Sequence, residues 1–127
     1  MKIQGRFLVT SCSTEVVYNN ITDAGIQRIL HLIAGQSQQA WGSIRLVGDD
    51  PGVFVQNTAS LEVKTGVLES SAIFTSAELT FEAKKIEMYA IDGTKVAEAD
   101  ANLAANQTYN IVRQDFLAQD GQVTGGV

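Results

Sequence analysis

The chain has 127 residues, of which 45% are hydrophobic and 18% charged, and its formal net charge is −5. This size and composition fit one domain with a real core, and the acidic balance argues against a protein that binds nucleic acid through a basic face. The sequence contains no run of about 18 apolar residues, so we expect no membrane-spanning helix and no membrane partner.

The first predicted elements are two strands, "KIQGRFLV" (residues 2–9) and "STEVVYNN" (residues 13–20). Cys12 lies between them and is the single cysteine of the sequence, which excludes an internal disulfide. "VTSC", ending at Cys12, fits the short motif at which bacterial lipoproteins are lipidated. A secretion signal, however, needs an apolar stretch of about 7–15 residues, and this segment is too short. We therefore expect an idle or buried thiol and synthesis in the cytoplasm.

A helix is predicted over residues 22–34, within "NITDAGIQRILHLIAG". Thr22 is placed to cap its N-terminus, where the charge of Asp23 is also favourable. Gly35 stands where a left-handed residue commonly ends a helix, and Gly25 allows a close approach to a neighbouring strand. Four apolar residues at positions i, i+3, i+4 and i+7 form a stripe that we expect in the core. They are Ile26, Ile29, Leu30 and Ile33.

Further strands are predicted at regular intervals after the helix, separated by polar connections and turns. The turn "DDPG", residues 49–52, separates the first of them from the rest. The predicted strands are "GSIRLVG" (residues 42–48), "ASLEVKTG" (residues 59–66), "SAIFTSAELTF" (residues 71–81) and "QTYNIVRQDFL" (residues 107–117).

The strongest hairpin signal is "KIEMYAIDGTKVAEA", residues 85–99. Asp92-Gly93 lies between two alternating runs, and this pair is favoured in two-residue hairpin loops. We expect a tight turn with at least one residue at positive φ. Ile86, Met88 and Ala90 share one side of the first strand, which is typical of a half-buried sheet.

These elements predict a mainly β protein, an antiparallel β-sandwich of jelly-roll type with one helix near the N-terminus. The helix is expected to cover an open end or face of the sandwich. We expect a single domain over residues 1–117 and a glycine-rich tail over residues 118–127. The N-terminal segment, residues 1–9, and the tail are each expected to add a strand to a neighbour's sheet.

The sequence offers no recognisable catalytic pattern. His31 is its single histidine, and one histidine with one cysteine cannot supply a zinc site. Asp49 and Asp50 lack the ligand spacing of a calcium-binding EF-hand, and no phosphate-binding loop is present. We therefore expect a protein that is not an enzyme and has no catalytic residues, no cofactor and no metal.

Three phrases of the chain together resemble a known class of proteins. They are "ITDAGIQRIL" (residues 21–30), "IRLVGDD" (residues 44–50) and "KIEMYAIDGTKVA" (residues 85–97). They are similar to the "T-x-A-G" helix start, the "I-x-x-L-G-x-G" strand end and the "E-I-G-L-F-D-x-D-G-T-L-L-A" hairpin of small structural proteins of tailed-bacteriophage virions. Such proteins stand alone or open tail-fibre and baseplate chains. The chain departs from the pattern at Asp50, Lys85 and Glu87, where the family has Gly, Glu and Gly.

The resemblance implies a structural role in a virion. No heptads or other repeats follow, so we expect a capsid decoration (cement) protein that binds the major capsid protein or other virion proteins. The alternative is an adaptor of the tail, neck, baseplate or fibre. In either case we expect a homo-oligomer, a trimer, located in the virion.

A further alternative is a receptor- or carbohydrate-binding module, in which Trp41 and Tyr89 would stack on sugars. Large aromatic and apolar side chains are the usual anchors of interfaces. The residues that we name as candidate partner contacts are Ile3, Phe7, Val9, Trp41, Tyr89 and Val123.

Overall fold

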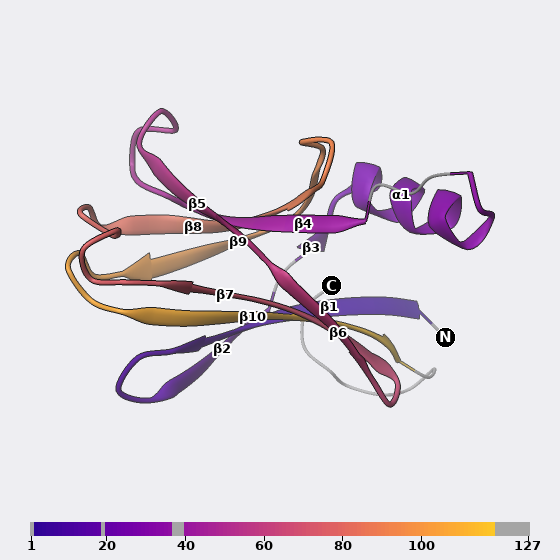
Figure 1. Ribbon diagram of the computed structural model, residues 1–127, viewed down its shortest axis with the longest axis horizontal. Helices are drawn as coiled ribbons and strands as arrows, with labels where there is room; N and C mark the ends of the chain where they lie inside the picture. The colour runs from indigo at the N-terminus through magenta and orange to yellow at the C-terminus, as the bar shows by residue number, and fades with distance from the viewer. Residues whose placement is uncertain (1, 19, 37–39, 119–127) are drawn as a thin grey trace.

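The computed structural model describes residues 2–18, 20–36 and 40–118, in which two antiparallel five-stranded sheets pack face to face beside one helix (Figure 1). This confirms the predicted mainly β sandwich with a helix near the N-terminus. The elements are β1 (Lys2–Thr10), β2 (Thr14–Tyr18), β3 (Asn20–Ile21), α1 (Asp23–Ile33), β4 (Trp41–Val47), β5 (Phe54–Thr58), β6 (Ser60–Lys64), β7 (Val67–Phe74), β8 (Ala83–Ala90), β9 (Lys95–Leu103) and β10 (Tyr109–Ala118). In this part of the chain, no helix has the length and apolar character needed to cross a membrane.

Sheet A has the strand order β2-β1-β10-β7-β6, and sheet B has the order β3-β9-β8-β4-β5. Within sheet A, β1 pairs with β10 along its whole length and with β2 from Arg6 to Thr10. The prediction that residues 1–9 form an arm for a neighbour's sheet is therefore wrong, because from Lys2 onward this segment is an integral strand of its own sheet. The predicted boundary of the tail is one residue early, since Ala118 still belongs to β10; residues 119–127 lie outside the described part of the chain.

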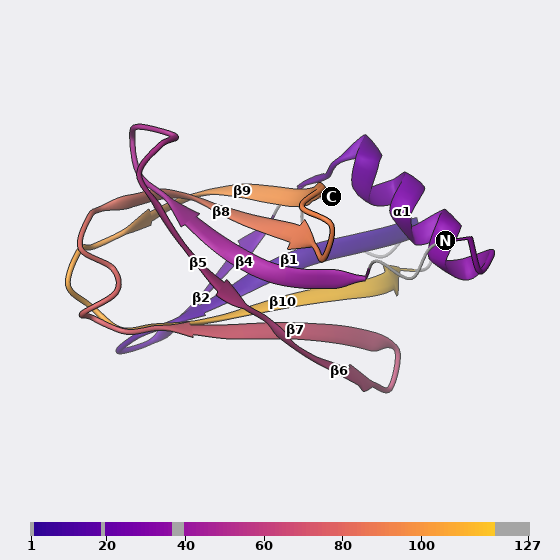
Figure 2. The same ribbon diagram turned by 45° about the horizontal axis from the view of Figure 1, so that its top comes forward.

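The strands β5 and β6 follow one another across one side of the sandwich (Figure 2). β5 is an edge strand of sheet B and β6 is an edge strand of sheet A, so the chain changes sheet at Ala59. The backbone N–H of Ala59 donates a hydrogen bond to the carbonyl of Gly42, which fixes the crossing point. β6 was predicted from the sequence within residues 59–66, but no strand was predicted at Phe54–Thr58.

The core lies between the two sheets. On β8, Ile86 and Met88 are fully buried and Ala90 is 2% exposed, which confirms that these residues share the inner side of the strand. The largest fully buried apolar side chains that join them are Phe7, Phe74, Ile44, Leu46 and Ile111 from the two sheets and Leu79 from the β7–β8 connection.

Leu79 reaches the core from a turn, although the sequence predicted one long strand over residues 71–81. β7 ends at Phe74, and the backbone N–H of Thr75 donates to the carboxylate of Glu78 at 3.0 Å. The N–H groups of Glu78 and Leu79 donate back to the carbonyl of Thr75. These local bonds satisfy the backbone of the turn, so the strand ends there in spite of its β-prone sequence.

Both ends of α1 have the predicted caps. The hydroxyl of Thr22 accepts a hydrogen bond from the N–H of Gly25 at 3.0 Å. At the other end, Gly35 has φ +71, and the N–H of Gln36 donates to the carbonyl of His31 at 2.8 Å. This 6→1 bond after a left-handed glycine is the pattern of a Schellman cap.

The hairpin between β8 and β9 contains the predicted positive φ, which Gly93 adopts at +89. Its loop has three residues, Ile91 to Gly93, rather than two. The N–H of Gly93 donates to the carbonyl of Ala90 at 3.0 Å, and the N–H of Ala90 donates to the carbonyl of Thr94 at 2.8 Å. A turn followed by a left-handed glycine is the common three-residue hairpin loop.

The strands lie so that the sandwich has two unlike ends (Figure 1). We call the end with α1 the helix end; it also holds the β6–β7 and β8–β9 turns and the start of β4. We call the opposite end the loop end; it holds the connections β1–β2, β4–β5, β7–β8 and β9–β10.

Candidate interaction surface

The helix is attached to sheet B mainly through its first turn. The N–H of Thr22 donates to the carbonyl of Val96 on β9 at 3.1 Å. A Cβ atom on Gly25 would lie 2.2 Å from that same carbonyl oxygen, so only glycine permits this approach. One turn further on, the guanidinium of Arg28 binds the carboxylate of Asp92 at 2.6 Å. The bond with Arg28, together with hydrogen bonds from Thr94, lowers the pKa of Asp92 from 3.8 to about 2.

These attachments rotate the predicted apolar stripe away from the core. Ile26, Leu30 and Ile33 are 42%, 50% and 76% exposed, and of the predicted four only Ile29 packs against the core. The prediction of a buried stripe is therefore wrong for three of its four residues. The face turned toward the sheets contains Gly25, Arg28, Ile29 and Leu32. It lies one residue, about 100° around the axis, from the predicted stripe, because the contact of Gly25 with β9 sets the rotation of the helix.

An apolar groove of about 280 Å³ lies between α1 and sheet A at the helix end. Its lining consists of Ile29, Leu32, Ile33, Ala40, Trp41, Leu68, Asp115 and Phe116. The one charged group among these, the carboxylate of Asp115, already has partners: the indole N–H of Trp41 donates to it at 2.9 Å, and Arg113 binds its other oxygen at 2.9 Å. The groove therefore offers mainly apolar surface to a ligand.

Arg113 lies inside the sandwich and binds Asp115, which lines this groove. Its side chain is 1% exposed and lies over the ring of Phe7 at 4.9 Å. A Cβ atom on Gly5 would lie 1.9 Å from its guanidinium, so the glycine provides the space that the charged group occupies. Because a buried charge is costly unless paired, the Arg113–Asp115 pair fixes the position of both side chains.

The apolar surface of the helix end continues onto β6. Val63 pairs with Leu68, which lines the groove, and Val63 is 82% exposed. The three most exposed large apolar side chains in the described part of the chain, Val63, Ile33 and Ile91, all lie at this end. Apolar side chains that stay exposed beside an apolar groove are typical of a surface that meets a protein partner. The sequence did not reveal that Val63 is exposed. An alternating pattern predicts a strand, but it does not show whether another layer covers the apolar side of that strand.

The outer face of sheet B carries a stack of aromatic and charged side chains. The guanidinium of Arg45 lies 4.0 Å from the ring centre of Phe54 and 4.3 Å from that of Tyr89. The hydroxyl of Tyr89 donates to Glu87 at 2.7 Å, and burial together with this carboxylate raises the pKa of Tyr89 above 10. Arg45 therefore covers one side of the Tyr89 ring, which the sequence analysis named as a candidate for stacking on a sugar.

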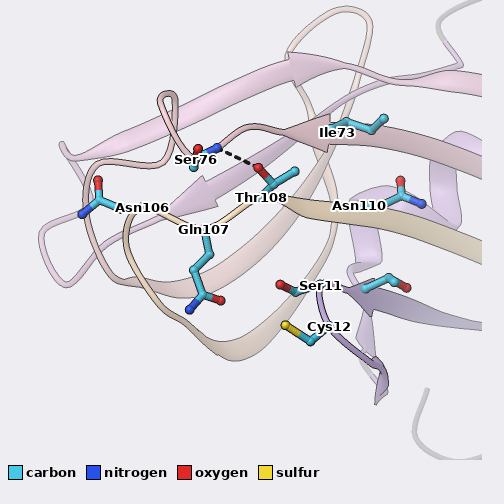
Figure 3. Close-up of a pocket in the computed structure, with 9 residues that line it drawn as sticks. Ser11, Cys12, Ile73, Ser76, Asn106, Gln107, Thr108 and Asn110 are labelled. Atoms are coloured by element: carbon cyan, nitrogen blue, oxygen red, sulfur yellow. Dashed lines mark hydrogen bonds between the residues drawn. The ribbon is translucent and has the colours of Figure 1, made fainter.

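The loop end contains a larger depression, of about 570 Å³, which is lined mainly by residues with polar but uncharged side chains (Figure 3). Ser11 and Cys12 border it from the β1–β2 turn, and Asn106 and Thr108 border it from the β9–β10 connection. The Thr108 hydroxyl accepts a hydrogen bond from the N–H of Ser76 at 3.0 Å. The lining residues offer hydroxyl and amide groups and a thiol but no carboxylate, imidazole, ammonium or guanidinium, so they supply no acid–base pair.

The candidate contact residues named from the sequence occupy different positions. Phe7 and Val9 are 0% and 3% exposed in the core, so their side chains are not at the surface. Ile3 pairs with Leu117 of β10. Trp41 is 5% exposed, which leaves its ring no free face for a sugar, but it lines the apolar groove. Tyr89 lies on the outer face of sheet B as described above, and Val123 lies outside the described residues.

The remaining candidates for chemistry lie apart. His31 is exposed on α1 at the helix end, and Cys12 is exposed at the loop end, in contrast to the buried thiol that was one of our expectations. Among residues 2–18, 20–36 and 40–118, no group of three or more His, Cys, Asp or Glu residues is placed to hold a metal ion.

Comparison with known proteins gives no relative: no protein-family model, no curated protein and no solved structure matches the chain.

Proposed function

We propose that the chain is a non-enzymatic structural protein of a tailed-bacteriophage virion, and that it is a capsid decoration (cement) protein which docks through its helix end. The observation that carries the proposal is the apolar surface formed by the exposed stripe of α1 and the groove beside it. Such a surface suits a permanent protein partner better than a small polar substrate.

The residues that carry the resemblance to virion proteins occupy structural positions. Thr22 caps α1 and Gly25 allows its contact with β9. Gly48 follows β4, and a Cβ atom at this position would lie 3.2 Å from the ring of Phe81. Gly93 adopts the positive φ of the β8–β9 turn. Because these residues shape the framework, they support a role that depends on the fold and on its surfaces.

In this proposal the mechanism is mechanical. The helix end buries its apolar side chains against the major capsid protein across a boundary between subunits, so that separating the subunits re-exposes this surface to water. Each copy contributes a limited free energy, but the lattice repeats it at every equivalent site. A trimer at three-fold positions of the capsid is the assembled state that we propose.

The alternative is an adaptor in the tail, neck, baseplate or fibre, which would use the same surface on a different virion protein. The two are distinguished by where the protein is found. Co-purification with heads supports decoration, and co-purification with tails alone supports the adaptor.

Mutation of the exposed stripe tests the proposal. Leu30 and Ile33 are 50% and 76% exposed, so the double change Leu30→Lys and Ile33→Lys should leave the fold intact. We expect this variant to lose co-sedimentation with virions and to stop protecting them against heat. The matched control is Ile73→Lys, at the loop end, where the side chain is 60% exposed; it should bind as the unmodified protein does. If the double variant binds and protects as well as the control, the proposed docking surface is wrong.

A further inference from the structure

We infer that the outer edge of β6 pairs with the same edge of a second copy of this chain, so that two copies of sheet A form one continuous antiparallel sheet around a two-fold axis at Val63. This goes beyond the proposed function, which concerns docking on the capsid protein and a trimer around a three-fold axis, and it does not depend on it. The two-fold contact is a separate one, and in an assembled lattice it would join copies that belong to neighbouring trimers.

The edge of β6 is open to such pairing. β6 is the last strand of sheet A, and all five of its residues are exposed. Among the described residues, no other strand pairs with its outer side. An edge strand with unpaired N–H and C=O groups and apolar side chains is a template for a further strand, and natural proteins usually cover or interrupt such edges.

The charges along β6 favour one register of a pair of copies. Glu62 lies opposite Glu69 of β7, a like-charge pair across the two strands, and the ammonium of Lys64 binds Glu69 at 2.8 Å. In a two-fold pairing centred on Val63, Lys64 of the second copy stands opposite Glu62, and the reverse pair forms as well. Opposite charges in facing positions stabilise a sheet. Centred one residue earlier, the pairing would place two Glu62 side chains against each other, which is unfavourable.

The apolar side of the strand favours the same register. Val63 is 82% exposed and would meet Val63 of the second copy on the inner side of the joined sheet, beside Leu68. The contact is small compared with the roughly 800 Å² that each partner buries in a stable complex. We therefore expect weak association in dilute solution and stronger association where many copies are held close together.

Disulfide trapping tests the register directly. In a Cys12→Ser background, which removes the exposed native thiol, Val63→Cys places two cysteines across the axis. Facing residues of antiparallel strands have Cα atoms about 4.5–5.5 Å apart, within reach of a disulfide. Leu61→Cys on the same edge would place its two cysteines roughly 14 Å apart along the strands, which is out of reach. Ile73→Cys, which is exposed on β7, reports random collisions.

Under mild oxidation we expect a covalent dimer from Val63→Cys at least tenfold faster than from Leu61→Cys or Ile73→Cys. Equal rates for the three variants, or a faster rate for Leu61→Cys, would overturn the inference.

A charge exchange on the Val63→Cys variant provides a second measurement. Glu62→Lys alone sets two lysines against each other across the axis, so trapping should slow several-fold. Adding Lys64→Glu should restore the rate, because both pairs then form with reversed sign and the introduced lysine also faces Glu69 within its own copy. If the double exchange traps as slowly as the single one, charge does not set the register and the inference fails.

Discussion

The strands β8 and β6 have the same kind of sequence and opposite environments. Both alternate apolar and polar residues, in "KIEMYA" and in "SLEVK". On β8, Ile86 and Met88 are fully buried, whereas on β6, Leu61 and Val63 are 45% and 82% exposed. The difference is that β8 lies within the sandwich opposite sheet A, while β6 lies at an edge where sheet B does not cover it. Alternation thus predicts a strand with two unlike faces, but it does not say which face another layer will cover.

The helix shows in the same way that an apolar pattern does not decide which side chains are buried. Ile29 and Leu30 are neighbours in the predicted stripe, yet Ile29 packs on the core and Leu30 is 50% exposed. The apolar side chains that remain outside at the helix end, on α1 and β6, are the ones that we propose for contact with other proteins.

The largest effect on stability is expected from truncating a buried side chain of β8. Ile86→Ala removes a fully buried side chain and should lower the free energy of unfolding by about 2–5 kcal/mol. Val63→Ala should change it by less than about 0.5 kcal/mol, because that side chain is mostly in water already. Urea denaturation of both variants measures the difference. Similar losses would mean that β6 is as well covered as β8.

The contact between Gly25 and β9 should be the next most sensitive position. Gly25→Ala improves helix propensity but places a Cβ atom against the carbonyl oxygen of Val96, so we expect a net loss of about 1–3 kcal/mol. Gly52→Ala is the matched control, because its nearest neighbour would lie 3.4 Å away at an exposed turn. The melting temperatures of the two variants, measured by thermal denaturation, test this expectation. A Gly25 variant at least as stable as the control would contradict the close packing of α1 against β9.

A smaller effect is expected at the β8–β9 turn, which fixes the buried hairpin. No atom lies within 4 Å of a Cβ on Gly93, so Gly93→Val acts only through its positive φ, at a cost of about 1–2 kcal/mol. Gly93→Asn should cost less, since asparagine tolerates the left-handed region better than a β-branched residue. Equal melting temperatures for these two variants would show that the turn does not require this backbone conformation.

The smallest effect concerns the bond that joins α1 to the same turn. The pKa of Asp92 is lowered from 3.8 to about 2, first by its bond with Arg28. A depressed carboxyl pKa stabilises the fold above the unfolded value, and this stability is lost as the pH falls from about 4 through about 2. Asp92→Asn should therefore show a weaker decline of stability between pH 4 and pH 2 than the unmodified chain. The two pH profiles, measured by denaturant unfolding, would be parallel if Asp92 did not contribute.

Much of the fold could be predicted because its signals are local. The caps at Thr22 and Gly35 and the turn at Gly93 depend on residues that are close in sequence, and all three were found from the sequence. The inner side of β8 was found from its period alone. The strand β5 was missed because "FVQNT" has two adjacent apolar residues followed by three polar ones, which is no alternating pattern. The excess strand after Phe74 was predicted because a turn held by Thr75 and Glu78 has no strong sequence signal.

The candidate surface could not be predicted because it depends on long-range packing. The exposure of Ile33 follows from the contact of Gly25 with Val96, about 70 residues away in the sequence. The burial of Phe7 and Val9, which we named as contacts, follows from the position of β1 inside sheet A, between β2 and β10. Trp41 was named for its size alone. Its position in the groove depends on α1, β7 and β10, which come together only in the folded chain.

The most direct test of the docking surface compares the protein free in solution with the protein assembled in virions. A small reactive probe that labels exposed apolar side chains should label Leu30, Ile33 and Val63 of the free protein, as it should label Ile73 at the loop end. In purified virions we expect labelling of Leu30 and Ile33 to fall at least several-fold while that of Ile73 remains. Unchanged labelling of Leu30 and Ile33 in virions that contain the protein would contradict the claim that the helix end is the docking surface.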